Sequence, residues 1–255
     1  MSDLFSAELP SSAGDVWNRL LGGESISEAS DPLDSEFLSL YGPLANPGKT
    51  PFVIAQLGQS LDGYIATQSG ASHYVTGPES LIHLHRLRAL CDAVVVGWRT
   101  VEADNPQLNI RHVDGEDPLR VIVDIEGKLP ASHRAFSMQE PGALRLTGEG
   151  VPALGDVKSE VIDVADGRAD PKAVIDLLAE RGCKKILMEG GGALVSSFLN
   201  AHVLDRLHLA IAPLLLGEGK RGIATPAAPS LDEALRLQGR QYKMGNDVLF
   251  DFDLR

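Results

Sequence analysis

Short apolar runs alternate with amphipathic stretches along the chain from residue 52 onward. Buried strands are predicted at residues 52–57, 93–96, 121–124, 185–188 and 205–212, with another near 143–146 in the otherwise ambiguous segment 126–160. Helices are predicted at residues 78–90, 100–103, 171–181 and 193–199. This alternation predicts an α/β domain with a largely parallel sheet that helices cover on both faces. Two antiparallel strands within residues 235–254, turning at Gly245, make the sheet mixed.

The helix predicted at residues 78–90 has a leucine at every third position, a spacing that predicts one face packed on the core. This side of the helix carries Leu81, Leu84, Leu87 and Leu90. His83 and His85 are two positions apart, so their side chains point about 200° apart and cannot share a metal ion. The chain also contains no G-x-S-x-G sequence. Metalloenzyme and serine hydrolase functions are therefore disfavoured.

The first fifty residues differ from the rest of the chain. Helical spacing is found at residues 12–21 and 34–40, separated by Gly22 and Gly23. Residues 41–51 contain glycine, asparagine and three prolines, which predicts a linker. We therefore expect an N-terminal helical extension with a linker over residues 1–50 and a main domain over residues 51–255. The extension is expected to lie on the main domain or on a partner subunit.

Composition and charge limit the possible functions. The chain has 255 residues, of which 44% are hydrophobic, enough for an ordinary core. Its formal net charge of −12 argues against a nucleic-acid partner, so arginines or backbone N–H groups must hold any anionic ligand. Cys91 and Cys183 are too few for a disulfide framework and are expected as buried free thiols. We see no secretory pattern and no apolar run near the ~20 residues of a membrane helix, so we expect a cytoplasmic protein.

Three glycines follow the predicted strand 185–188, directly after Glu189. Gly190, Gly191 and Gly192 lead into the predicted helix 193–199. Glycine lets the backbone approach a ligand closely, and a helix N-terminus offers free N–H groups and the positive end of its dipole. Neither the G-x-G-x-x-G spacing nor the Lys-Ser/Thr of a P-loop is present. On spacing alone, a phosphate site and a tight turn without a ligand are equally good interpretations.

A second turn between strand and helix carries polar side chains. Gly97, Arg99 and Thr100 follow the predicted strand 93–96, and ligands collect at the carboxyl ends of strands in open α/β sheets. Arg99 could contact a phosphate, although an arginine in this place is more often a solvated surface group. Asp104 follows at a helix end, where it would either cap the backbone or contact substrate or cofactor.

Six segments in a fixed order give a more specific identification. They are Ser60-Leu61-Asp62-Gly63, residues 69–76, Leu87-Arg88-Ala89, residues 100–111, Glu189-Gly190-Gly191-Gly192 and residues 212–217. Over residues 52–254 the chain resembles the reductase domain of the bifunctional riboflavin-biosynthesis deaminase–reductases, a relative of dihydrofolate reductase. The resemblance implies a dihydrofolate-reductase-like fold and a homodimer. It also implies hydride transfer from NADPH to the ribosyl C1′ of 5-amino-6-(5-phosphoribosylamino)uracil, giving the ribityl product.

The same resemblance implies a division of roles among the site residues. Substrate contacts are implied for Ser72, Arg88, Leu108, Arg111 and Glu189. NADPH contacts are implied for Gly58, Tyr74, Thr100, Asp104, Gly191, Gly192, Ala193, Leu194 and Val195, and the second turn adds Gly97 and Arg99. Asp104 and Glu189 are the candidate catalytic residues. The proton donor stays open between these two carboxyl groups and a bound water.

Three features depart from the family pattern. The chain lacks the H-x-E and P-C-x-x-C sequences of the deaminase half, so we expect a stand-alone reductase. Gln56 stands where these reductases often carry a lysine, and residues 1–50 lie outside the pattern. Reduction of another pyrimidine, pteridine or related heterocycle is therefore the first alternative. A non-catalytic NADP-binding module is the second, which the substrate-type residues Ser72, Arg88, Arg111 and Glu189 disfavour.

Overall fold

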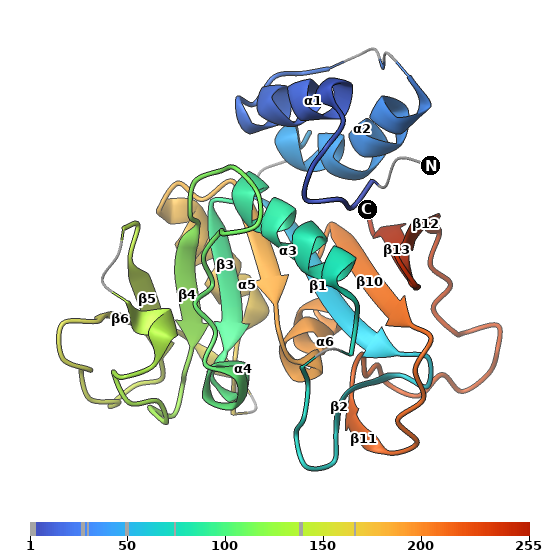
Figure 1. The fold of residues 1–255 in the computed structure, drawn as a ribbon. Helices are drawn as coiled ribbons and strands as arrows, with labels where there is room; N and C mark the ends of the chain where they lie inside the picture. Colours follow the sequence, from blue (N-terminus) through green and yellow to red (C-terminus); the bar gives the residue numbers. More distant parts are fainter. Residues whose placement is uncertain are drawn as a thin grey trace.

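The computed structural model describes residues 4–26, 29, 31–48, 51–73, 75–137, 140–165 and 167–255. Its main sheet has nine strands, which Figure 1 shows twisted through the centre of the molecule. In spatial order they are β12 (Gly239–Met244), β13 (Asp247–Asp253), β10 (Arg206–Ala212), β1 (Phe52–Ser60), β9 (Lys185–Glu189), β3 (Ala93–Gly97), β4 (Leu119–Val123), β5 (Ala143–Thr147) and β6 (Lys158–Val161). The strands from β10 to β6 run parallel, and β12 and β13 form an antiparallel hairpin at one edge.

Helices cover both faces of this sheet. They are α1 (Ser11–Leu21), α2 (Pro32–Ala45), α3 (Pro78–Leu90), α4 (Trp98–Asp104), the 3-10 turn η1 (Arg134–Phe136), α5 (Pro171–Glu180) and α6 (Gly192–Asn200). The remaining strands form two small two-stranded sheets. One pairs β2 (Tyr64–Thr67) with β11 (Gly219–Arg221), and the other pairs β7 (Val164–Ala165) with β8 (Arg168–Ala169).

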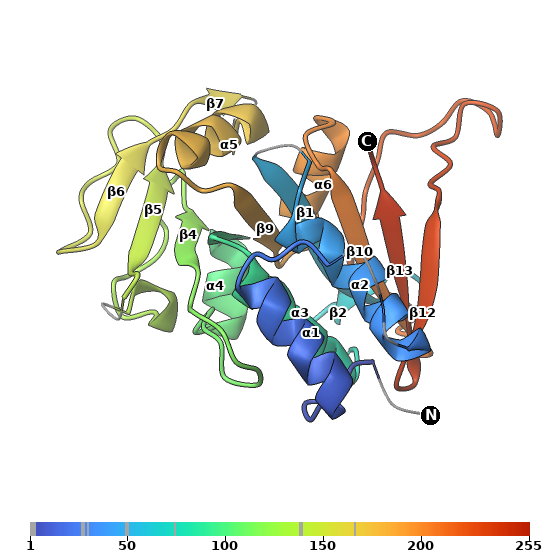
Figure 2. The same ribbon diagram turned by 90° about the horizontal axis from the view of Figure 1, so that it is seen from above.

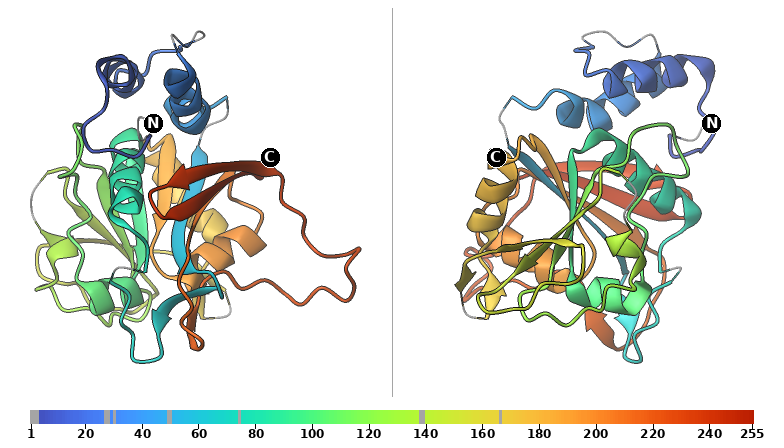
Figure 3. Two further views of the ribbon diagram at one scale, coloured as in Figure 1. Left: turned by 45° about the vertical axis from the view of Figure 1, so that its right-hand side comes forward. Right: turned by 90° about the vertical axis from the view of Figure 1, so that its left-hand side faces the viewer.

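Alternate residues of the parallel strands feed two separate hydrophobic cores. Ile54 and Leu187 pack in the core beneath α3, whereas Val53 and Met188 pack in the core beneath α5 and α6. Figure 2 shows α1, α2 and α3 layered on one face, and the right-hand view in Figure 3 shows α5 and α6 on the opposite face. The predicted α/β class, the mostly parallel sheet and the C-terminal hairpin are confirmed, as are the main helices.

Some predicted boundaries were wrong. Strand β1 continues past residue 57 to Ser60, and α4 occupies Trp98–Asp104 rather than residues 100–103 alone. In the ambiguous segment the strand near 143–146 is confirmed as β5, and β6 follows it. Both cysteines are buried free thiols, as expected. Among the described residues, no helix has the length and apolar content needed to cross a bilayer.

The leucine repeat of α3 describes only part of its buried side, since Leu84, Leu87 and Leu90 pack on the core as predicted. Leu81 is exposed, whereas His83, His85 and Arg86 are fully buried. His83 and Arg86 are buried because α1 and α2 lie across the outer side of α3 (Figures 1 and 3), whereas His85 lies beneath the loop at Arg111. The extension therefore packs on the main domain within one chain, which was one of the two expected arrangements.

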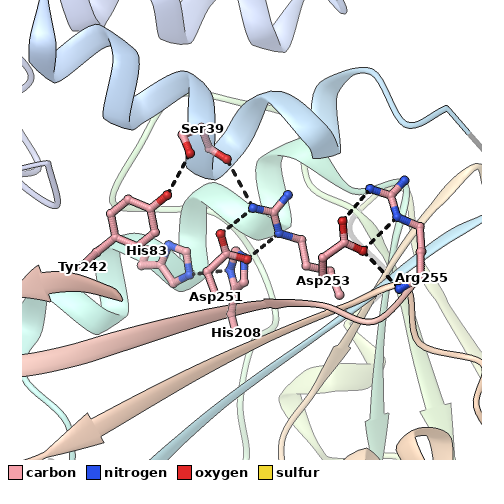
Figure 4. Close-up of polar contacts among 8 residues, drawn as sticks. Ser39, His83, His208, Tyr242, Asp251, Asp253 and Arg255 are labelled. Carbon is pink, nitrogen blue, oxygen red and sulfur yellow. Dashed lines mark hydrogen bonds and ion pairs between the residues drawn. The ribbon is translucent and has the colours of Figure 1, made fainter. Parts of the chain in front are cut away.

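The linker predicted at residues 41–51 begins too early, because α2 continues to Ala45 and includes Pro43. A proline inside a helix leaves the carbonyl four residues earlier without its N–H donor, here the carbonyl of Ser39. The Arg206 guanidinium donates to this oxygen at 3.2 Å. The Ser39 hydroxyl also contacts the Tyr242 hydroxyl at 3.0 Å (Figure 4). Contacts with distant strands thus stabilise a helix that local sequence predicts to end.

Candidate active site

A buried ion pair lies where β9 meets α3. Glu189 ends β9, and its carboxylate accepts from Arg88 Nε at 2.8 Å and from Arg88 Nη2 at 2.5 Å. The Arg88 and Glu189 side chains are only 5% and 11% exposed. A third guanidinium nitrogen, Arg88 Nη1, donates to the backbone oxygen of Asn109 at 2.9 Å. The bidentate geometry fixes the Glu189 carboxylate, the one acid that precedes the glycine run.

Gln56 lies beside this ion pair on the same face of the sheet. In the register of the parallel strands, Gln56 of β1 is opposite Glu189 of β9 on one side and His208 of β10 on the other. Its side chain is buried and makes no hydrogen bond within the part of the chain that the structure describes. Its amide atoms are not among the fully enclosed polar atoms that lack a partner, so they keep access to solvent and could contact a ligand bound next to Glu189.

A short hydrogen bond joins two of the predicted site residues across the loop after β2. Ser72 Oγ donates to Asp104 Oδ1 at 2.7 Å, and both side chains are half-buried. Asp104 is the last residue of α4, and Asn105 ends the helix in the left-handed region with φ 41°. The helix is therefore closed by Asn105, and the Asp104 carboxylate faces the loop that carries Ser72 rather than capping backbone.

The loop after α4 carries Leu108 and Arg111. Leu108 has a left-handed φ of 58°, and its side chain is 1% exposed within the core, so a substrate could contact it only through its backbone. Arg111 is exposed, and its Nη1 donates to Asn109 Oδ1 at 3.0 Å. Partial burial, with repulsion from Arg88 and Arg134, lowers the pKa of the Arg111 guanidinium. These arginines make a local positive field in an acidic protein.

Arg134 was missed from the sequence because it lies in the segment with ambiguous periodicity. It begins η1, and its backbone N–H donates to Asn105 Oδ1 at 2.8 Å. Tertiary contacts to Asn105, from this N–H group and from the His133 ring at 3.3 Å, bring η1 to the end of α4, and the local pattern carries no signal of them.

The glycine run is closely packed. A Cβ on Gly190, whose φ is 109°, would lie 2.9 Å from Thr100 Oγ1. A Cβ on Gly192 would lie 1.9 Å from the carbonyl oxygen of Gly222. The Gly191 N–H donates to Thr100 Oγ1 at 2.9 Å, which ties α4 to α6. Gly191 is the N-cap of α6, and no side chain caps this helix end. Packing alone requires these glycines, while the uncapped first turn of α6 can accept an anion.

A cavity of about 220 Å³ opens beside this helix end. It is lined by Gly97, Trp98, Arg99, Thr100, Val123, Ile125, Glu126, Gly167, Arg168, Ala169, Gly191, Ala193, Leu194 and Ser197. The Arg99 guanidinium lies over the Trp98 ring, 4.6 Å from its centroid. The structure thus brings together the predicted cofactor residues of both turns, and adds Arg168 and Ser197, which the sequence did not indicate.

Among the described residues, four predicted cofactor residues lie outside this cavity lining, and one of them is Asp104, which contacts Ser72 instead. Val195 is fully buried in the core beneath α6, and Gly192 is buried against Gly222. Gly58 lies within β1 and packs against Thr76, where a Cβ would lie 2.9 Å from Thr76 Cγ2. Tyr74 lies outside the described residues. Within the described part of the chain, no group of three or more acidic, histidine or cysteine side chains could hold a metal ion.

Comparison with known proteins identifies similar chains. The model of the RibD C-terminal domain family matches residues 51–250. The 2,5-diamino-6-ribosylamino-4(3H)-pyrimidinone 5′-phosphate reductase of Methanothermobacter thermautotrophicus is 32% identical over 215 residues, covering 80% of this chain and 99% of the relative. The riboflavin biosynthesis protein RibD of Chlamydia trachomatis is 34% identical over 177 residues, covering 66% of this chain but 47% of the relative. The chain thus spans about half the length of such RibD relatives.

Solved structures agree in fold. RibD of Acinetobacter baumannii has a TM-score of 0.69 at 25% identity, covering 87% of this chain and 62% of that one. The riboflavin biosynthesis reductase Rib7 of Saccharomyces cerevisiae has a TM-score of 0.69 at 22% identity, covering 85% of this chain and 96% of that one, a likeness in fold alone.

Proposed function

Because the chain belongs to the family of RibD C-terminal domains, we propose that it is a stand-alone reductase of riboflavin biosynthesis that uses NADPH. Its proposed substrate is 5-amino-6-(5-phosphoribosylamino)uracil or the corresponding 2,5-diaminopyrimidinone. The observation that carries the proposal is the buried Arg88–Glu189 pair, held one residue before the glycine run. This arrangement sets a fixed carboxylate and a cluster of arginines near the glycine turn, and Gly191 of that turn lines the cavity that we assign to the nucleotide half of the cofactor.

The proposed reaction converts a ribosylamine to a ribitylamine. When bound, the nicotinamide cofactor would supply a hydride to the sugar C1′. The bond from C1′ to the ring oxygen would break, and this oxygen would take up a proton. Ser72, Arg88 and Arg111 suit the 5′-phosphate and sugar hydroxyls, because guanidinium groups bind phosphate through charge-assisted hydrogen bonds. Glu189 would accept from the pyrimidine N–H groups. The chain's main contribution would be to align the two reacting carbons and to exclude water.

The cavity beside α6 fits the nucleotide half of a nicotinamide cofactor. The first turn of α6 offers backbone N–H groups to the pyrophosphate, and Arg99 and Arg168 suit the 2′-phosphate that distinguishes NADPH from NADH. We expect Arg99→Ala and Arg168→Ala each to weaken NADPH binding about tenfold or more while changing NADH binding little. Calorimetric titration with NADPH and with NADH measures the two affinities. If both affinities fell equally, the assignment of these arginines to the 2′-phosphate would be wrong.

Substrate identity is best tested with two compounds that differ at pyrimidine C2. The uracil has an oxygen there, whereas the diaminopyrimidinone, for which the Methanothermobacter relative is named, has an amino group. An amide can accept from an amino group or donate to an oxygen, so Gln56 would contact either one. Each compound is mixed with protein and NADPH, and the loss of nicotinamide absorbance is followed. A flat trace with both, from folded protein, would exclude these substrates.

The proposed division of roles predicts a clear kinetic result. Glu189→Gln and Arg88→Ala should each reduce turnover by about a hundredfold or more, while NADPH affinity stays nearly unchanged. Asp176→Asn makes the same carboxylate-to-amide change as Glu189→Gln, at an exposed site on α5, and serves as the control. If the site variants lost NADPH binding and kept their turnover, substrate and cofactor roles would be wrongly divided.

The two alternatives have different signatures. A reductase of another heterocycle would oxidise NADPH only with that compound, and a binding module would bind NADP tightly without turnover of any. The homodimer and the cytoplasmic location stay predictions. Sedimentation velocity would measure whether the protein is a dimer.

A further inference from the structure

His85 is a fully buried histidine that the proposed chemistry does not use. It lies on α3 three residues before Arg88, so both side chains leave the helix on neighbouring positions of one side. The backbone N–H of Arg111 donates to His85 Nδ1 at 3.2 Å. A histidine of the core thus contacts the loop that carries the exposed arginine of the site.

This contact determines the form of the imidazole. A nitrogen that accepts a hydrogen bond carries no proton, so the proton of the neutral ring lies on Nε2. Burial, with repulsion from Arg88 and Arg111, lowers the pKa of His85 to about 3, which keeps the ring neutral. Nε2 has no hydrogen-bond partner in the described residues, and the ring meets that of His112 edge to face, with centroids 4.6 Å apart.

An unpaired buried N–H group costs free energy that an apolar side chain of similar size would avoid. What histidine supplies here, and an apolar side chain would not, is the acceptor at Nδ1. The residue type is therefore explained by the hydrogen bond to the Arg111 backbone.

The loop is held at three consecutive residues. The Asn109 carbonyl accepts from Arg88 Nη1, the Ile110 N–H donates to Asp117 Oδ1 at 2.6 Å, and the Arg111 N–H donates to His85. Two of these three contacts come from one side of α3. The same helix therefore sets the position of the Glu189 carboxylate and of the Arg111 backbone.

We propose that His85 is a positioning residue for substrate binding, which fixes the Arg111 backbone so that its guanidinium stands ready for the 5′-phosphate. The inference rests on the proposed function, in which Arg111 binds this phosphate. His85 touches neither substrate nor cofactor, and it acts through Arg111.

Two substitutions at His85 separate positioning from packing. In His85→Asn the side-chain oxygen takes the place of Nδ1 and keeps the acceptor, whereas in His85→Gln the amide lies further out and the acceptor is lost. Both remove the ring. We expect His85→Gln to raise the KM for the phosphorylated substrate roughly tenfold, with kcat and the KM for NADPH nearly unchanged, and His85→Asn to restore the KM.

Other outcomes overturn the proposal. If both variants keep the wild-type KM, or if both lose kcat and NADPH binding together, His85 does not position Arg111. If neither variant folds, the hydrogen bond to His85 can still be tested in the wild-type protein. Nitrogen-15 NMR of the His85 ring should show the proton on Nε2 and a hydrogen bond to Nδ1, and the opposite tautomer would contradict the geometry.

Arg111→Ala distinguishes this proposal from the proposed function. If Arg111→Ala leaves the substrate KM unchanged, the phosphate assignment of Arg111 fails. If Arg111→Ala raises the KM but His85→Gln does not, only the role of His85 fails. With both correct, the KM of the double variant should equal that of Arg111→Ala, because His85 acts through Arg111 alone.

Discussion

Acidification should destabilise this protein before its carboxylates become protonated, because several histidines are buried in neutral form. His83 Nδ1 contacts the Tyr41 hydroxyl at 2.8 Å. On the other side of the ring, His83 Nε2 contacts His208 Nδ1 at 3.0 Å, a contact that Figure 4 shows. His85 lies on the same helix beneath the loop at Arg111. Burial lowers the pKa of all three histidines, that of His85 to about 3.

The direction of this change in stability with pH follows from proton uptake by the unfolded chain. Below about pH 6.5 the unfolded chain takes up protons that the folded protein does not, so the free energy of unfolding falls as the pH falls from about 6.5 toward 3. For His85, the loss between about pH 8 and pH 5 is about 2 kcal/mol, from a pKa of 6.5 in the unfolded chain and about 3 in the folded protein. His83 and His208 change the stability in the same direction. The effect is large against a typical total of about 5–15 kcal/mol.

Urea denaturation at about pH 8 and about pH 5 measures this loss. In His85→Asn the loss should be about 2 kcal/mol smaller than in the wild type, because a titrating group is removed. The difference between the two proteins isolates His85 from every other titrating group. His202→Asn, in the exposed turn after α6, is the control. A free energy of unfolding that is equal at the two pH values, or an undiminished loss in His85→Asn, would refute the reasoning.

Three further substitutions test the packing. Gly192→Ala places a Cβ 1.9 Å from the Gly222 carbonyl oxygen, so calorimetry should show nicotinamide-cofactor binding weakened at least about tenfold, with about 1–3 kcal/mol of stability lost. Asp251→Asn leaves the buried Arg206 guanidinium without the carboxylate that it binds at 2.5 Å, which should cost about 3–5 kcal/mol in chemical denaturation. Trp17→Ala removes a buried ring of α1 that packs on Phe37 and Tyr41 of α2, and it should cost about 3–5 kcal/mol, visible as a lower Tm.

The parallel strands were predictable because each is a short apolar run whose alternate residues enter two cores. Val94 and Val95 are adjacent and fully buried, yet they belong to opposite cores, which only a strand covered on both faces allows. The helix through Pro43 was not predictable, since the donor that replaces the lost N–H comes from Arg206, far along the chain. Local pattern carries no information about such a partner.

The candidate site, like the fold, was predictable where local sequence determines it and not where distant contacts do. Two strand-to-helix turns identified Glu189, Thr100 and the glycines, because the carboxyl ends of parallel strands meet at one edge of the sheet. The pairing of Arg88 with Glu189 and of Ser72 with Asp104 required the tertiary structure. So did the cavity residue Arg168, which lies on a two-residue strand that leaves no periodic signal.

Helix α3 shows why hydrophobic periodicity identifies only part of the buried side of a helix. On one side His83 contacts Tyr41 of α2, and Arg86 donates to the backbone oxygens of Leu4 and Ser6 at 2.6 and 2.5 Å.

On its other side, His85 and Arg88 hold the loop and the carboxylate of the site. A helix with polar contacts on two sides buries more than its apolar stripe, and its charged groups can be buried only if other parts of the chain satisfy them. The N-terminal helices therefore complete the outer environment of the helix that orders the proposed substrate site, which gives the segment before residue 50 a structural role in that site.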